Sequence, residues 1–397
     1  MATTSGYQAG VETNATQLSY GVEVTWGTAP AIQFQAIRYT SETLALNKTR
    51  NRPAEINSTR EASQGVTTQQ VAQGSINYAF SWQTYDDFIS CVLQADWQAS
   101  VPIASIAGDI TITTGTNVLS STLGTKFTAI LAGTWIRLFG FTNSVNNGLF
   151  YVTTKTDNSH LVLSGNPSAF VTETPSGTAA QVRYGNIRNS NAFRSLWIQQ
   201  QFSPSLFLEY AGSYVSRWTM TGGIGNFPTG AFDIIAKSEA SAVSNASTGA
   251  VLAATTGRVF DPVAGWITAT FNEVAVATAI DQFSLTVENT GAAGEFAMGS
   301  AGLAGMLGGM LTVTGSFRAY FKDFTLYTNF ANETSGRLAF QIRDNLGNAY
   351  IITILNAIML INVDAGGPNV PVYATVNLEG GPAAGGGTIM VDRLPVT

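Results

Sequence analysis

The segment INYAFSW, residues Ile76–Trp82, alternates between large apolar residues and small or polar ones. Its apolar residues therefore share one face of an extended chain, which is typical of a β-strand with one buried and one solvated face. The same alternation recurs along the whole chain, so the sequence predicts a mainly β fold. It returns at Phe283, Leu285 and Val287; at Phe317, Ala319 and Phe321; at Leu338, Phe340 and Ile342; and at Val372, Ala374, Val376 and Leu378.

A helix is predicted directly after this segment. Thr84 stands three residues before Asp87, a spacing typical of a helix N-cap, and acidic residues in a first turn favour the helix dipole. Asp86 and Asp87 are therefore interpreted as capping residues, since neighbours on a helix point about 100° apart and form no facing catalytic pair. Apolar residues then recur at spacings of three and four, which places Cys91 in a buried stripe rather than in a reactive site. The stripe consists of Phe88, Cys91, Val92 and Ala95.

Turn residues separate the predicted strands. Asn147-Gly148 is typical of a tight hairpin, and Gly347 within Asp344–Asn348 favours a short loop. The apolar run Ile351–Val363 is too short to cross a bilayer and is interpreted as a buried pair of strands interrupted by a turn. Ala297–Leu311 is apolar but rich in Gly, so it is interpreted as a small-residue segment, with a short membrane-active helix as the alternative.

Two shifts in composition indicate an insertion into a larger β domain. The segment between them is dense in Thr, Gly and Ser, and insertions of this kind are accommodated in exposed loops of a host domain. We therefore expect residues 101–186 to form a small β module between the two halves of the host domain, residues 1–100 and 187–397. Strands are expected within the module at Trp135–Phe139, Phe150–Thr153 and Leu161–Leu163.

The composition excludes several classes of protein. Of 397 residues only 11% are charged, against roughly 25% in an average domain. The 19 basic and 25 acidic residues give a net charge of −6, which argues against a nucleic-acid binder with a basic footprint. An ordinary hydrophobic share of 45% argues against disorder, and one Cys excludes a disulfide framework.

No catalytic or cofactor motif is found. Gly223-Ile224-Gly225 does not extend to a dinucleotide fingerprint, because Pro228 stands where the third glycine belongs. The one histidine, His160, follows Asp157-Asn158-Ser159 at an expected hairpin tip, and no Gly-x-Ser-x-Gly elbow supplies a serine nucleophile. We therefore expect no enzyme activity, no cofactor and no metal site.

A long polar region, Asn47–Gly74, contains almost no large apolar residue. A stretch of this length without secondary structure is uncommon in a compact domain and is usually either disordered or functional. It is therefore our candidate for a contact surface. Its charged residues are Lys48, Arg50, Arg52, Glu55, Arg60 and Glu61.

The order of segments along the chain resembles that of a known family. The first half runs through Ser19–Gly27 (SYGVEVTWG), Ile37–Leu46 (IRYTSETLAL), Asn57-Ser58-Thr59-Arg60 and Thr84–Phe88 (TYDDF). The second half runs through Gly133–Leu163, Trp197–Phe202 (WIQQQF), Tyr214–Ile235 and Thr312–Asp323 (TVTGSFRAYFKD) followed by Phe330. This succession, from about residue 19 to residue 378, resembles the tail tube (major tail) proteins of tailed bacteriophages.

The resemblance implies a fold and a function. The fold would be a tail-tube-type β-sandwich or barrel with one or two short helices, plus the inserted module. The chain would be a structural virion protein that polymerises as stacked, typically hexameric rings into a tube. DNA would pass through the lumen to the host without specific binding. The polar region would contact the adjacent ring and become ordered on assembly, and the module would decorate the outside.

Partners and location are implied in the same way. The partners would be further copies of the chain, the tail terminator, and the tail tip and tape-measure proteins, with no membrane involved. Residues Met1–Gly10 lack the basic start and apolar core of a secretory signal, so assembly is expected in the host cytoplasm. Low charge suits such a subunit, because interface cores are depleted in charged residues.

Two alternatives remain open at this point. One is another virion β protein, such as a capsid decoration or baseplate component. The other is a carbohydrate-binding or hydrolase module, suggested by the all-β pattern and the many Trp and Tyr. A glycosidase needs two carboxylates across a cleft, and the 25 acidic residues form no recognisable pair.

Overall fold

A computed structural model describes residues 10–56, 58–106, 108–164, 170–177, 180–276, 279–300 and 302–396. Residues 1–9 and Asn57, which figure in the expectations above, lie outside the described residues. The chain is mainly β, as predicted, with two short α-helices, α1 (Asp86–Leu93) and α2 (Thr325–Ala331). Short 3-10 turns lie at Thr13–Ala15 and Ser144–Asn146.

Most strands belong to one large sheet whose neighbouring strands pair antiparallel. Its central order is β4–β5–β16–β15–β20–β23–β26–β25–β24–β18. The strands are β1 (Gln17–Val22), β2 (Gln35–Ala36), β3 (Ser41–Glu42), β4 (Ala45–Asn51), β5 (Val66–Ala79), β13 (Asn186–Arg188), β14 (Leu196–Ser203), β15 (Leu206–Gly223), β16 (Asn226–Ala236), β17 (Ser238–Ala242), β18 (Trp266–Phe271), β19 (Val274–Ala275), β20 (Ile280–Thr290), β23 (Met310–Tyr320), β24 (Gly336–Arg343), β25 (Ala349–Asp364), β26 (Tyr373–Gly380) and β27 (Ile389–Leu394).

The large sheet curls around one hydrophobic core, so that strands far apart in the sheet face each other. The rings of Phe283 on β20 and Phe340 on β24 lie 5.5 Å apart, although three strands separate them in the sheet. The rings of Phe80, just after β5, and Tyr350 on β25 lie 5.4 Å apart. The alternating apolar residues of the sequence therefore form the inner faces of a sandwich.

Helix α1 packs against this core, but the expected cap is wrong. The helix begins at Asp86 with Tyr85 in the N-cap position and no capping side chain. The hydroxyl of Thr84 instead shares a hydrogen bond of 2.6 Å with Ser81, because Thr84 is buried where the chain leaves the sheet. Cys91 is buried in the apolar stripe, as predicted.

The two acidic residues of α1 tie the helix to other strands rather than capping it. Asp86 is buried, accepts a hydrogen bond from the Tyr350 hydroxyl and forms an ion pair with Arg393 on β27. Burial raises the pKa of the Asp86 carboxyl, and the Arg393 guanidinium opposes that rise. Asp87 accepts a hydrogen bond of 2.9 Å from the Tyr20 hydroxyl on β1. Both residues therefore stabilise the position of α1 against the sheet.

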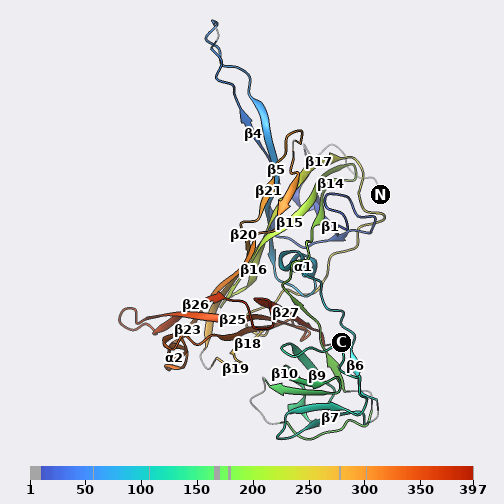
Figure 1. The fold of residues 1–397 in the computed structure, drawn as a ribbon, viewed down its shortest axis with the longest axis vertical. Coiled ribbons are helices and arrows are strands. Elements are labelled where there is room, and N and C mark those ends of the chain that lie inside the picture. Colours follow the sequence, from blue (N-terminus) through green and yellow to red (C-terminus); the bar gives the residue numbers. More distant parts are fainter. Residues whose placement is uncertain are drawn as a thin grey trace, which may run out of the picture.

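The long polar region is not unstructured, contrary to the expectation. Its two ends form β4 and β5, which pair from Ala45 opposite Gln73 to Asn51 opposite Val66. The resulting hairpin, called here the arm (residues 45–73), projects far from the body (Figure 1). The sequence hides this pairing because side chains on both faces of its outer part are exposed, so no apolar alternation is needed.

The apolar run Ile351–Val363 is one continuous strand, so its interpretation as two strands with a turn is wrong. It lies within β25, which pairs with β24 on one edge and with β27 and β26 on the other. Tyr350 and Ile352 face the core, whereas Ile351 and Leu355 face the inserted module. Burial on both faces explains why apolar residues follow one another up to Leu355, whereas farther along the strand Ile358 and Leu360 are exposed.

The inserted segment forms a second sheet with a core of its own. It contains β6 (Ile103–Ala104), β7 (Ile110–Thr113), β8 (Val118–Ser121), β9 (Trp135–Phe139), β10 (Gly148–Asp157), β11 (His160–Ser164) and β12 (Gln181–Arg183). We call residues 103–183 the module. Asn147-Gly148 is not a tight hairpin as expected, because a longer loop at 140–147 joins β9 to β10 and Asn147 bonds back to Phe141 within it.

The segment Ala297–Leu311 contains no helix among the residues that the structure describes. It contributes β22 (Gly305–Leu307), which pairs with β21 (Ala293–Glu295) in a small ribbon, and the first residues of β23. Across the described chain, neither helix has the length and apolar character to span a membrane.

Candidate assembly surfaces

The arm carries all six charged residues that the sequence singled out. Lys48 and Arg50 lie on β4, and Arg52, Glu55, Arg60 and Glu61 lie in the tip between the two strands; all six are exposed. The tip is shaped by local bonds rather than by a core. Arg50 donates to the Gly65 carbonyl at 3.0 Å, Ser63 donates to the Glu55 carboxylate at 2.7 Å, and Arg60 adopts a left-handed φ of 60°.

The outer part of the arm has no strand beside it. Residues 66–71 of β5 pair only with β4, since pairing with β16 begins at Ala72, and β4 has no second strand partner in the described chain. A two-stranded hairpin alone is marginally stable, and its free edges are ready to pair with another chain. Ile56 and Val66 add exposed apolar side chains. The arm is therefore suited to contact another protein chain.

A second surface joins the module to the body. Trp135 and Tyr151 of the module pack against the outward faces of β25 and β27, and the Arg137 side chain donates to the Gly347 carbonyl at 2.6 Å. The Arg337 guanidinium on β24 lies 4.8 Å from the centre of the Tyr151 ring. The residues of the body buried there are Ala339, Ile351, Leu355, Met390 and Leu394.

One buried carboxyl group lies in this joint. Asp392 on β27 is 0% exposed, and its Oδ1 accepts a hydrogen bond of 3.2 Å from the backbone N–H of Trp135. Its Oδ2 has no hydrogen-bond partner among the described residues. Burial raises the pKa of Asp392 well above its usual value, opposed only by that one N–H bond, so the folded chain favours the protonated acid.

Comparison with known proteins identifies the family. The family model described as phage tail tube protein matches residues 13–392. The chain belongs to the phage tail tube protein family. The match includes the arm, the inserted module and the curled sheet up to Asp392 in β27. A search of curated proteins gave no match.

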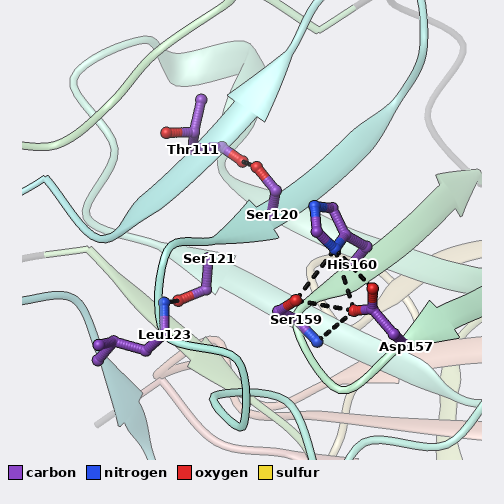
Figure 2. Close-up of polar contacts among 7 residues, drawn as sticks. All are labelled: Thr111, Ser120, Ser121, Leu123, Asp157, Ser159 and His160. Atoms are coloured by element: carbon purple, nitrogen blue, oxygen red, sulfur yellow. Dashed lines mark hydrogen bonds and ion pairs between the residues drawn. The ribbon is translucent and has the colours of Figure 1, made fainter.

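The expected hairpin tip at His160 is confirmed, and its polar cluster stabilises that turn of this tail tube protein (Figure 2). The Asp157 carboxylate accepts hydrogen bonds from the N–H and hydroxyl of Ser159, at 2.7 and 2.8 Å. These bonds, with that to His160, lower the pKa of Asp157 to about 2. His160 meets both Asp157 and Ser159 through the same ring nitrogen, Nδ1. A catalytic histidine must use its two nitrogens separately, so the cluster cannot relay a proton in a triad.

The family consists of structural tail tube proteins. Among the described residues of this chain, no group of three or more His, Cys, Asp or Glu is placed to hold a metal ion. The tryptophans also give little support to a carbohydrate-binding surface. All seven lie in described segments, and each is at least partly buried. Trp135 and Trp218 are almost completely buried.

Sequence reasoning missed the joint between module and body. Its signal was present in the segment from Ile351 to Leu355, which is apolar apart from Thr353, since a strand with one wet face would alternate. Asp392 could not be singled out, because the sequence does not show which carboxyl group is covered by a tryptophan more than 250 positions earlier.

Proposed function

We propose that this tail tube protein polymerises as stacked, hexameric rings into the tail tube through which phage DNA is delivered to the host. The observation that carries the proposal is a family match over residues 13–392 in a chain whose arm extends away from its own body. The family implies self-assembly into a tube, and the outer strands of the arm pair only with each other, so that their outer edges are free.

The arm would make the contact between successive rings. Its free strand edges can add to a sheet of the next ring, and its tip presents Arg52 and Arg60 beside Glu55 and Glu61 to a charged partner surface. The arm is already paired as a hairpin in the isolated subunit, so stacking would require less ordering of backbone than a disordered loop would.

The module would lie on the outside of the tube, and the ends of the tube would meet the tail terminator, the tail tip and the tape-measure protein. The location would be the virion, with assembly in the host cytoplasm. Purified full-length chain tests this proposal in solution. We expect sedimentation to show rings or longer polymers, whereas a single monomeric species at every concentration would contradict it.

A module deletion tests whether the module belongs to the wall. Removing residues 103–183 exposes the apolar side chains of Ile351, Met390 and Leu394 to water. The deletion variant therefore also carries Ile351→Thr, Met390→Thr and Leu394→Thr. We expect this variant to form tubes that are thinner on the outside but equally long by electron microscopy. The control is the chain that keeps residues 103–183 and carries the same three substitutions. In this control the apolar contacts to the module are lost, but the module itself is present. A deletion variant that folds as a monomer and forms no tubes would place the module within the wall.

A further inference from the structure

The curled sheet has two outward faces that point away from each other. The inner side chains of β20 and β24 meet at Phe283 and Phe340, so their outer side chains lie on opposite sides of the sandwich. The outer face of β24, β25 and β27 is covered by the module through Ile351, Met390 and their neighbours. The outer face of β5, β16, β15, β20, β23 and β26 carries no module (Figure 1).

This second face is lined by hydroxyl groups. Ser284 on β20 and Ser316 on β23 share a hydrogen bond of 2.8 Å, and so do Thr290 and Thr312. The alternation of each strand places its core residues inward and these residues outward, where Met310 and Tyr320 at the two ends of β23 are also exposed. We call this set the hydroxyl face: Thr219 and Thr221 on β15, Thr229 on β16, Ser284, Thr286 and Thr290 on β20, Thr312, Thr314 and Ser316 on β23, and Thr375 on β26.

The strands of this face carry few charges, and both of their arginines are paired. Arg318 lies 2.6 Å from the Asp281 carboxylate, and Arg217 lies 3.8 Å from that of Asp233. Glu209, Glu288 and Glu379 are the other carboxylic acids on these strands, and there is no lysine on them. The balance is therefore slightly negative, with no unpaired cation.

Such a surface is poor at holding DNA. Duplex DNA carries one negative charge per roughly 1.7 Å, and proteins that retain it do so by releasing its counterions with Lys and Arg. Hydroxyl groups that already bond to one another and to the sheet stay hydrated without contributing a net charge. DNA would meet water and neutral dipoles along this face.

We infer that the hydroxyl face lines the lumen of the tube and that the module-covered face points outward. The inference rests on the proposed tube and adds which of the two sheet faces DNA passes. A seven-stranded module on the other face leaves that face unsuited to a continuous inner wall. The hydroxyl face is broad, belongs to one unbroken run of strands and lacks free cations, as a passage for DNA requires.

Cysteine labelling of assembled tubes tests this assignment. The chain has one cysteine, Cys91, which is buried, so an introduced cysteine can be read without background. Thr286→Cys and Thr314→Cys report on the hydroxyl face, and Thr154→Cys on the exposed side of β10 is the matched control. Each variant is co-assembled with excess full-length chain, then treated with N-ethylmaleimide or with a maleimide carried on a gold particle too large to enter a tube.

We expect gold labelling of both sheet cysteines to fall at least tenfold on assembly, while N-ethylmaleimide still reacts and Thr154→Cys is labelled equally before and after. Gold labelling of the sheet cysteines that persists in tubes would overturn the inference. Protection from both reagents would also overturn it, because the face would then lie in a subunit interface. If the unsubstituted chain forms no tubes at all, it is the proposed function that fails.

Discussion

Replacing residues 52–65 with a two-residue Asn-Gly turn is expected to give a folded subunit that forms no tubes. The new turn would join Asn51 directly to Val66, which already lie opposite each other in the arm. No described residue of the removed tip is buried, so the core loses nothing. The free energy of unfolding of the truncated chain should stay within about 0.5 kcal/mol of that of the parent, or rise slightly because closing a shorter loop costs less entropy.

The loss of assembly should be nearly complete. The arm would form the contacts between stacked rings. The truncation removes its tip from every subunit, and with it Arg52, Glu55, Arg60 and Glu61. Sedimentation and negative-stain microscopy measure the polymer, and thermal unfolding measures the fold. As a matched control, the same Asn-Gly turn replaces Gly115-Thr116 between β7 and β8 of the module, where we expect normal tubes. Tubes of normal length from the truncated arm would refute its role in stacking, and an unfolded variant would show that the tip belongs to the fold.

The second large effect is expected from Asp392→Asn. This variant should be more stable than the parent, by an amount that grows as pH rises. Asp392 is raised in pKa by burial in the folded chain, whereas in the unfolded chain it titrates near its ordinary value of about 3.9. Between these two values the folded state keeps a proton that the unfolded state has lost. The stabilising contribution of the protonated acid is therefore complete below the unfolded pKa and falls by about 1.4 kcal/mol per pH unit as pH rises toward the folded pKa.

Asparagine has no proton to lose and can still accept the bond from the Trp135 N–H through its carbonyl oxygen. The difference in free energy of unfolding between Asp392→Asn and the parent should therefore grow by about 1.4 kcal/mol per pH unit above about pH 5, until the pH reaches the folded pKa of Asp392. Denaturant titrations at several pH values measure it. Asp261→Asn is the control, because backbone N–H bonds from the turn at Ala264 lower the pKa of Asp261. Asp261 is then charged in both the folded and the unfolded chain above about pH 5, so its difference from the parent should stay constant there. A constant difference for Asp392→Asn across this pH range would show that Asp392 is charged in the folded chain.

Much of the β architecture could be predicted because its strands have one buried face. The segment at Ile76 and the strands around Phe283, Phe317 and Phe340 alternate for that reason, and their burial is as expected. The expectation for the arm was wrong because the outer strands of the arm have no buried face. Its outer strands are paired through the backbone while both faces stay wet, so their side chains carry no period for sequence reasoning to detect.

The contacts of the acidic residues could not be predicted, because they depend on partners far away in the chain. Asp86 has the spacing of a helix-cap residue, yet its carboxylate meets Tyr350 and Arg393 from the opposite end of the sequence. The Asp392 carboxyl group accepts a hydrogen bond from the backbone N–H of Trp135 in the module. Sequence spacing alone specifies neither long-range contact. The hydroxyl face was likewise hidden, since Ser and Thr on alternate positions identify a wet face but not what it faces.

The central claim is tested most directly by electron microscopy of the purified full-length chain, with end-on views averaged. We predict hollow tubes of stacked rings, each with an open lumen and the modules projecting from the outside. Uniform single subunits at high protein concentration, or solid fibres without a lumen, would contradict the assignment of this chain as the wall of a DNA passage.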